Sequence, residues 1–263
     1  YAPRRVEIIV VDDGSSASVI SKTATRFDVT VIRHVKAKGF CAAVNTGIAA
    51  ANSEIVELLN DDAEVTEGWA EAILPHFEDA GIAAVTPVVQ FLDGRIDTAG
   101  DEYDPGGFAR KLHHKQRRRA ATARERDRGS APLRSRLVES VSACAAFYRR
   151  DALLRIGGFP EQFGAYFDDV DVACRLRKQG YQLIVEPRST VIHHGGQSHR
   201  PSRRLLQQQS RNEEWLYWRN NDSLKTLPRH AAVLAGKALR RLEEGNLGPW
   251  LAGRLRAVTA SRW

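Results

Sequence analysis

Short apolar runs alternate with segments of helical composition along the first ninety residues of the chain. A run of four to seven mostly apolar residues that stops at a turn signal is typical of a buried strand. Strands separated by helices pair in parallel through right-handed crossovers, so the pattern predicts an α/β fold with a mostly parallel central sheet flanked by helices. The expected strands are 6–11, 29–32, 55–59 and 83–89, and the expected helices are 39–51 and 67–78.

Two of these four expected strands end in paired aspartates. Asp12 and Asp13 follow the first strand, and Asp61 and Asp62 follow the third. Because ligands of open α/β sheets bind beyond the carboxyl ends of the strands, we expect both pairs on one rim of the sheet. Carboxylates there repel phosphate unless a divalent cation lies between them. Capping of the following helices is the alternative, and it explains one pair more easily than two.

The second half of the chain continues the mixture of strands and helices. An apolar stretch with small residues spans 138–148, and the turn Gly157-Gly158-Phe159-Pro160 follows a short helical segment. Gly and Pro in succession mark a turn rather than a continued helix. The expected elements are a helix at 150–156, strands at 181–186 and 189–194, a polar helix at 205–224 and basic amphipathic helices within 231–263.

Three carboxylates, Asp168, Asp169 and Asp171, lie directly ahead of a helical segment that Gly180 closes. Free backbone N–H groups and the helix dipole favour negative charge at such a position, and Asp171 can pair with Arg175 four residues later. Capping plus one surface ion pair is therefore one interpretation of this cluster. The other is that one of these carboxylates acts as a base.

Charge is concentrated in one segment. The net charge is +7, yet residues 109–136 alone hold eleven Lys or Arg against two acidic residues, so the rest of the chain is slightly acidic. A single-stranded nucleic-acid binder interleaves aromatic residues with its basic ones, and this segment has only His113 and His114 as aromatic rings. We expect a solvated loop, or contact with an anionic substrate or membrane surface, and no nucleic-acid partner.

The length of the chain and its few cysteines limit the class of protein to which it can belong. A chain of 263 residues fits one large domain with appendages, and it contains no run of eighteen apolar residues that could cross a membrane. Three widely spaced cysteines argue against a disulfide framework and suit a reducing, cytoplasmic compartment. The chain opens on Tyr1-Ala2-Pro3 and holds no Met, which we interpret as a fragment or trimmed domain.

The order of the motifs resembles family 2 glycosyltransferases, nearest their rhamnosyltransferase-like branch. The donor half of that family resembles Val11 to Ser15, Lys38-Gly39-Phe40 with Asn45, and Leu58 to Asp62. The acceptor half resembles Tyr148 to Ala152, Gly157 to Phe159, Asp168 to Asp171 with Arg175, His193 with Gly196 and Ser198, and Arg219-Asn220. Each motif alone is weak, whereas the ordered set spans about 6–221 and is specific.

The resemblance implies a GT-A fold and inverting transfer of a sugar from a nucleotide-diphosphate donor, of UDP or dTDP type, to a glycan or lipid-linked acceptor. Its catalytic base would be Asp169, with Asp168 as the close competitor. Asp62 and His193 would hold a divalent cation, Mg²⁺ or Mn²⁺, with Asp171 and Arg175 behind the site. Donor-binding positions would be Asp12, Asp13, Lys38, Gly39, Asn45, Asn60 and Asp61.

The resemblance also implies a division of the chain. Residues 1–100 would form the donor-binding half, 101–226 the acceptor and catalytic half with the basic insertion 109–136, and 227–263 a helical extension. Lipid-linked acceptors would place the protein in the cytoplasm at the inner face of the membrane. The Arg-rich extension, with Trp250, Leu251, Leu255 and Trp263, would then lie on an anionic membrane surface, or else pack on the domain or lead into further sequence.

Two departures from the family pattern support a second hypothesis. Asn60 replaces the first carboxylate of the usual metal-binding motif, and the family's first strand and helix are expected to be missing. A catalytically silent domain that binds sugar nucleotides or glycans is therefore the alternative to an enzyme.

Overall fold

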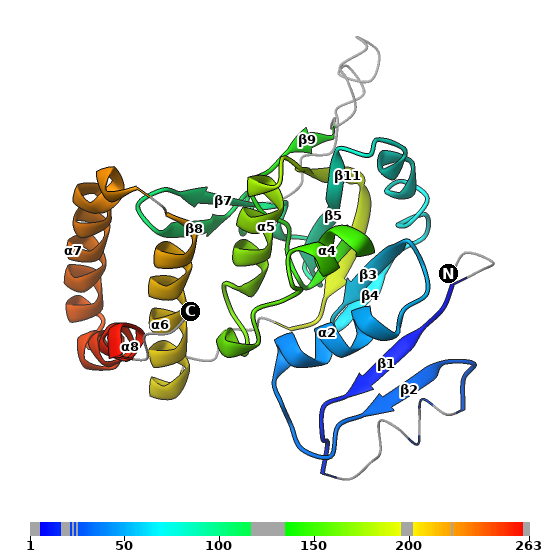
Figure 1. Ribbon diagram of the computed structural model, residues 1–263, viewed down its shortest axis with the longest axis horizontal. Coiled ribbons are helices and arrows are strands. Elements are labelled where there is room, and N and C mark those ends of the chain that lie inside the picture. Colours follow the sequence, from blue (N-terminus) through cyan, green and yellow to red (C-terminus); the bar gives the residue numbers. More distant parts are fainter. Residues whose placement is uncertain are drawn as a thin grey trace.

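A computed structural model describes residues 6–16, 22, 24, 26–116, 135–195, 202–221 and 223–259. Helices lie against a central sheet, the strands β1 and β2 lie at one end of the molecule, and the C-terminal helices lie at the other (Figure 1). The α/β class predicted from the sequence is confirmed by this arrangement.

The central sheet has seven strands in the described residues and is mixed. Its path is β3-β10-β5-β11-β4, with β6 on β5 and β9 on β11. Only the β5–β11 pair is parallel, so the prediction of a mostly parallel sheet is wrong for this sheet. The strands are β3 (Ile55–Leu59), β4 (Ala63–Val65), β5 (Ile82–Phe91), β6 (Ile96–Thr98), β9 (Arg136–Leu137), β10 (Ala145–Arg149) and β11 (Gln182–His193).

The strands β1 (Ile9–Asp12) and β2 (Thr30–Arg33) form a separate parallel pair. Asp12 and Asp13 thus follow a strand of one sheet, and Asp61 and Asp62 follow a strand of the other. The prediction that both pairs lie on one rim of a single sheet is therefore wrong in that form.

Two buried clusters fill the two faces of the central sheet. The larger contains side chains from α2 (Phe40–Ala50), α4 (Arg150–Arg155) and α5 (Asp168–Lys178), and the smaller packs Trp69, Ile73 and Phe77 on the sheet. Strand β5 is buried along most of its length because both clusters use its side chains. Burial on both faces explains its near-continuous apolar sequence.

The helix predicted at 67–78 is not an α-helix. Turns occupy most of this segment, and only Leu74–Glu78 forms a short 3₁₀-helix, η1. Pro75 lacks an N–H group and would clash inside an α-helix. Trp69, Ile73 and Phe77 still lie in the core, so the apolar pattern predicted the buried residues correctly. The α-helical conformation predicted from the same pattern is wrong.

The two strands predicted at 181–186 and 189–194 are one strand, β11, interrupted by an irregularity. Its register against β5 shifts between Glu186 and Thr190, which lie opposite Pro87 and Val88. Because proline cannot donate to a ladder, such a shift is expected beside it. The shift carries the end of β11 to its place beside β4, where His193 lies opposite Ala63.

The basic segment starts in an ordered hairpin. Strands β7 (Asp101–Asp104) and β8 (Phe108–Lys111) pair with each other, and residues 112–115 form turns. The first residues of the loop predicted at 109–136 thus lie in a strand and a turn, and its residues 117–134 lie outside the described residues. The hairpin positions Asp101 and Lys111 close to the strands that end at the candidate site.

Helix α6 (Arg203–Asn220) carries the C-terminal helices α7 (Leu227–Glu243) and α8 (Leu247–Thr259), with η3 (Leu224–Thr226) between α6 and α7. Arg254 of α8 forms buried ion pairs with Glu213 and Glu214 of α6. A buried charge is tolerated only when paired, so these contacts fix α8 on α6. Among the described helices, none combines the length and the apolar character needed to cross a bilayer.

Candidate active site

The ladder between β4 and β11 brings Asp62 and His193 together. Asp62 immediately precedes β4, and His193 is the last residue of β11, opposite Ala63. The backbone N–H of His194 donates to the carbonyl of Asp62 at 2.7 Å, and His193 Nε2 lies 3.3 Å from Asp62 Oδ1. The two residues predicted as metal ligands are therefore adjacent in the structure.

Gly195 closes one side of this pair. A Cβ atom at Gly195 would lie 2.0 Å from Asp62 Oδ2 and 3.0 Å from His193 Nε2. Such contacts are far shorter than van der Waals distances, so no larger residue fits here without displacing the pair. Glycine, which has no Cβ, lets the backbone come this close to the pair.

Asp62 and His193 fit a divalent cation. Asp62 Oδ1 is buried and has no hydrogen-bond partner, which is unusual for a carboxylate oxygen. Two ligand atoms held about 2.1 Å from one ion can lie 3.3 Å apart. No group of three or more His, Cys, Asp or Glu side chains in the described part of the chain converges on one point, so further ligands would come from the substrate diphosphate or water.

The other ring nitrogen of His193 is held by Asp97. His193 Nδ1 donates to Asp97 Oδ2 at 3.0 Å, and Lys111 Nζ donates to the second oxygen at 2.7 Å. The hydrogen bond to Asp97 is the main cause that raises the pKa of His193 to about 10. Burial alone would raise the pKa of Asp97, but the hydrogen bond from His193 and the charge of Lys111 lower it overall.

Asp168 and Asp169 lie in the first turn of α5, as the sequence predicts. Asp168 is buried, and its Oδ2 atom has no hydrogen-bond partner. Asp169 is partly exposed; Oδ1 accepts from the N–H of Val170 at 2.9 Å and Oδ2 from that of Ala143 at 3.3 Å. Only Asp169 combines backbone anchoring with solvent access, which a base that meets a substrate needs.

Burial raises the pKa values of three neighbouring carboxyl groups. The pKa of Asp168 rises to about 8, first by burial and then by the charge of Asp169. The same two causes, in the same order, raise that of Asp101 to about 7. Burial also raises the pKa of Asp169, although backbone N–H groups and Lys111 oppose the rise. Carboxyl groups with raised pKa values gather at functional sites.

The segment before β10 connects the two halves of the site. The N–H of Ala143 donates to Asp169. The next residue, Cys144, is among the groups that raise the pKa of His193. The carbonyl of Cys144 also accepts from the N–H of Asn60 at 2.9 Å. The Asp62–His193 pair and Asp169 therefore flank the same short segment.

The first donor motif is a turn held together by its own aspartates. Asp12 is buried and accepts from the N–H of Ser15, whereas Asp13 accepts from the N–H groups of Lys38 and Gly39 at 2.9 and 2.8 Å. Burial alone would raise the pKa of Asp13, and these hydrogen bonds, with that from His34, lower it. Asp13 thus fixes the loop that leads into α2.

Asn45 and Asp171 join elements around the site. Asn45 exchanges two hydrogen bonds with the backbone of Phe159, at 2.8 and 2.9 Å. Asp171 is buried and binds Arg175 at 2.8 Å, the predicted pair, together with Arg219 and Asn220 of α6. Asp171 and Arg175 therefore support α5 from behind, and the donor contact predicted for Asn45 stays a prediction.

Asn60 and Asp61 occupy the turn between β3 and β4. The carbonyl of Asn60 accepts from the N–H of Ala63 at 3.1 Å, and Asp61 is exposed. This turn presents Asp62 toward His193. The donor-binding roles of Asn60 and Asp61 stay predictions.

Sequence reasoning missed Asp97, Asp101, Lys111 and Cys144. Asp97 and Asp101 are buried carboxylates in the segment 96–101, where every residue is buried. Aspartate is almost never fully buried without a partner, but the sequence alone does not display burial in a segment with no clear periodicity. The only sequence signal for this part of the site was that Asp97 and Asp101 lie close together, shortly after a turn.

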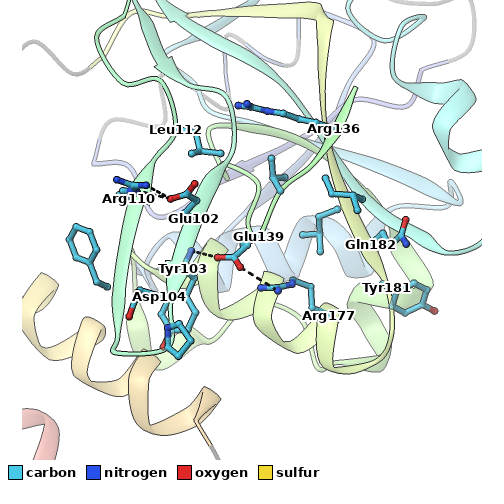
Figure 2. Close-up of a pocket in the computed structure, with 15 residues that line it drawn as sticks. Glu102, Tyr103, Asp104, Arg110, Leu112, Arg136, Glu139, Arg177, Tyr181 and Gln182 are labelled. Carbon is cyan, nitrogen blue, oxygen red and sulfur yellow. Dashed lines mark hydrogen bonds and ion pairs between the residues drawn. The ribbon is translucent and has the colours of Figure 1, made fainter. Parts of the chain in front are cut away.

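A cavity of about 870 Å³ lies away from this site, between the β7–β8 hairpin, β9 and the end of α5 (Figure 2). The ion pairs Arg110–Glu102 and Arg177–Glu139 line it. None of the residues predicted for catalysis, donor binding or metal binding contributes to its lining. The cavity therefore adds no residue to the candidate active site.

The mixed α/β sheet with helices on its faces matches the GT-A fold of solved glycosyltransferases. Two solved structures share this fold. GalNAc-T7 with UDP, GalNAc and Mn²⁺ has a TM-score of 0.60 at 16% identity, covering 80% of this chain and 42% of that one. The mannosyltransferase PcManGT from Pyrobaculum calidifontis, in complex with GDP-Man and Mn²⁺, has a TM-score of 0.53 at 18% identity, covering 97% and 79%.

The chain belongs to glycosyl transferase family 2, whose profile matches residues 2–157. The pre-mycofactocin glycosyltransferase of Mycobacterium tuberculosis is 33% identical over 194 residues, which cover 72% of this chain and 38% of that protein. The N-acetylglucosaminyl-diphospho-decaprenol L-rhamnosyltransferase of M. tuberculosis is 26% identical over 213 residues, covering 74% and 68%. The predicted family is confirmed, and the chain spans well under half the length of the first relative.

Proposed function

We propose that this chain is an inverting glycosyltransferase that moves a sugar from a nucleotide-diphosphate donor to a hydroxyl acceptor. The observation that carries the proposal is that the Asp62–His193 pair and the partly exposed Asp169 both adjoin one segment, Ala143–Cys144. One side of the site suits a cation with a diphosphate, and the other suits a base.

In this scheme Asp169 accepts the proton of the acceptor hydroxyl. The acceptor oxygen bonds to the anomeric carbon on the face opposite the diphosphate, and the bond between that carbon and the diphosphate oxygen breaks, which inverts the configuration. A divalent cation at Asp62 and His193 supplies positive charge for the departing diphosphate. Asp168 is too deeply buried to reach the acceptor, so we assign it to positioning rather than to proton transfer.

The donor is proposed to be of UDP or dTDP type, with the loop fixed by Asp13 and the residues Lys38 and Gly39 beside the nucleotide. The acceptor is proposed to be a glycan or a lipid-linked glycan, because the rhamnosyltransferase relative is named for a decaprenol-linked substrate.

We place the membrane-facing surface on α8. Leu251, Leu255 and Val258 are exposed on one face of this helix, with Arg256 beside them. An apolar stripe bordered by arginine suits the surface of an anionic membrane. Trp250, expected on this surface, is instead buried beneath Arg254, and Trp263 lies outside the described residues.

The alternative is a catalytically silent domain that binds sugar nucleotides. The replacement of a carboxylate by Asn60 favours it, because the site then offers the cation only one carboxylate from this motif. Binding and turnover must therefore be measured separately.

Calorimetric titration of UDP, dTDP and GDP, with and without Mn²⁺, tests the donor site. We expect Mn²⁺-dependent binding of one nucleotide, loss of that binding in Asp62→Ala, and unchanged binding in the control Asp151→Ala, whose exposed side chain pairs only locally on α4. Asp169→Asn should bind normally but lose about 10²-fold or more in turnover.

Each outcome separates the hypotheses. Binding without turnover in the unmodified chain would favour the silent domain. Equal turnover in Asp169→Asn and the unmodified chain would exclude Asp169 as the base, and a selective loss in Asp168→Asn would transfer that role to Asp168. Absence of any nucleotide binding would overturn the proposed function.

A further inference from the structure

We propose that Asp97 is a positioning residue that aims His193 at the cation held by Asp62. Asp97 accepts from His193 Nδ1 at 3.0 Å, while His193 Nε2 lies 3.3 Å from Asp62 Oδ1. The inference rests on the proposed function, since it assigns a role toward the same cation.

The direction of the hydrogen bond decides which nitrogen is available. An ionised carboxylate can only accept, so Nδ1 of His193 carries a hydrogen whenever it contacts Asp97. In the neutral ring this leaves the lone pair on Nε2, the atom that faces Asp62. Partners of this kind fix the tautomer and ring orientation of metal-binding histidines, and losing them typically lowers metal affinity about 10–100-fold.

A local irregularity in β6 directs Asp97 to this place. Thr98 lies opposite Val89 and Ile96 lies opposite Gln90, so Asp97 is an extra residue without a partner in the ladder. A bulge of this type turns a side chain away from its regular direction and is common beside active sites. Asp97 is 2% exposed, which leaves it little freedom to leave His193.

The ring of His193 is also held from its face. Phe91, the last residue of β5, stacks on His193 with ring centroids 6.5 Å apart and planes 18° apart. The stacked Phe91 ring restricts tilting of the His193 imidazole, and the hydrogen bond to Asp97 restricts rotation of the imidazole about its bond to Cβ. Together these contacts leave Nε2 aimed at Asp62.

A merely structural role for Asp97 must be separated from this one. Lys111 and His114 also contact Asp97, so the residue could serve only to anchor the β7–β8 hairpin. Replacing Lys111 weakens the hairpin anchor, of which His114 remains, and should leave the bond between Asp97 and His193 in place. Lys111→Gln is therefore the matched control.

The experiment measures the Mn²⁺ dissociation constant of the full chain in the presence of UDP, by the electron paramagnetic resonance of free Mn²⁺. Asp97→Ala, His193→Ala, the double variant and Lys111→Gln are compared with the unmodified chain, and thermal unfolding without metal reports the fold of each. We expect Asp97→Ala to weaken Mn²⁺ binding about 10–100-fold. Lys111→Gln should leave it unchanged or tighter, because a positive charge near the site is lost.

The double variant gives the deciding comparison. If Asp97 acts through His193, replacing Asp97 in the His193→Ala background causes no further loss of affinity. An equal loss in both backgrounds would mean that Asp97 acts by charge alone and would overturn the inference. So would normal binding in Asp97→Ala, whereas Mn²⁺ binding that is absent from the unmodified chain or insensitive to Asp62→Ala would instead overturn the proposed cation site. Asp97→Leu, which is similar in size and offers Nδ1 no acceptor, repeats the cycle should Asp97→Ala not fold.

Discussion

His193 is flanked by carboxylates at both ring nitrogens, Asp97 on one side and Asp62 on the other. This environment stabilises the imidazolium, and its pKa of about 10 means that the ring is protonated at neutral pH when no cation is bound. A cation must displace that proton, because a metal ligand uses the lone pair that the proton occupies. Under the proposed function, binding of the cation at His193 would therefore depend on pH.

The stability of the metal-free protein should fall as pH rises. The folded pKa of His193 lies above the unfolded value of about 6.5, so its contribution is fully present below pH 6.5 and is lost on the way to pH 10. Over this pH range, we expect the free energy of unfolding of the unmodified chain to fall by at least about 1 kcal/mol more than that of His193→Gln. Urea unfolding at several pH values in the presence of a chelator measures the difference.

Asp101 and Asp168 act in the same direction, since their raised pKa values also favour the protonated state. They are present in both proteins, so the comparison isolates His193. Parallel pH profiles for the unmodified chain and His193→Gln would contradict the prediction.

At the scale of elements, the start of α5 depends on α6. Tyr166 and Phe167 have φ values of 73° and 64°, a conformation that is unfavourable for residues with large side chains. The buried amide of Asn212 donates to the carbonyls of Phe163, Ala165 and Tyr166. Asn212, together with Gln208 and Arg211 of the same helix, therefore holds the turn that presents Asp168 and Asp169.

Asn212→Leu should relax this turn. Loss of buried hydrogen bonds should destabilise the fold by about 1–3 kcal/mol, and misplacement of Asp169 should lower turnover about tenfold or more while nucleotide binding persists. Denaturant unfolding, turnover and UDP titration measure these effects. Gln207→Leu, on the same helix but bonded to Arg256 of α8, is the control, and a matching loss of turnover in Gln207→Leu would show that any change in α6 suffices.

At the scale of the whole molecule, α7 and α8 lie at the opposite end from β1 and β2 (Figure 1). Lys237 of α7 and Arg254 of α8 both pair with Glu213 of α6, so these helices are attached to the domain by buried charges. The exposed stripe of α8 is left facing outward, with Leu255 66% exposed. The outer face of α8 therefore presents an apolar surface, whereas Ala257 on its inner face joins the larger buried cluster.

Flotation with liposomes tests this surface. We expect the chain to float with vesicles that contain anionic lipid and to lose about tenfold or more in bound fraction when Leu251 and Leu255 are replaced by Glu. Leu224→Glu is the control, because Leu224 is exposed in η3 rather than on α8. Equal flotation of all variants, or none by the unmodified chain, would remove α8 as a membrane contact.

Much of the local structure was predictable because local interactions produce it. The apolar runs gave the strands β1, β2, β3 and β5, and the spacing of Asp171 and Arg175 gave their ion pair. The positions of Asp168 and Asp169 in the first turn of α5 follow from the preference of helix starts for carboxylates. The helix predicted at 67–78 failed where Pro75 outweighed an apolar pattern that fits more than one conformation.

The sequence by itself determined the family, the α/β class and the identity of the residues Asp62, Asp169 and His193 as candidates. Only the tertiary structure decided which side chains support them. The bond between Asp97 and His193 joins residues 96 positions apart and depends on a bulge in β6 and on the register of β11 against β5. Ladder register and bulges result from packing across the whole sheet, so no pattern within a few neighbouring residues encodes them.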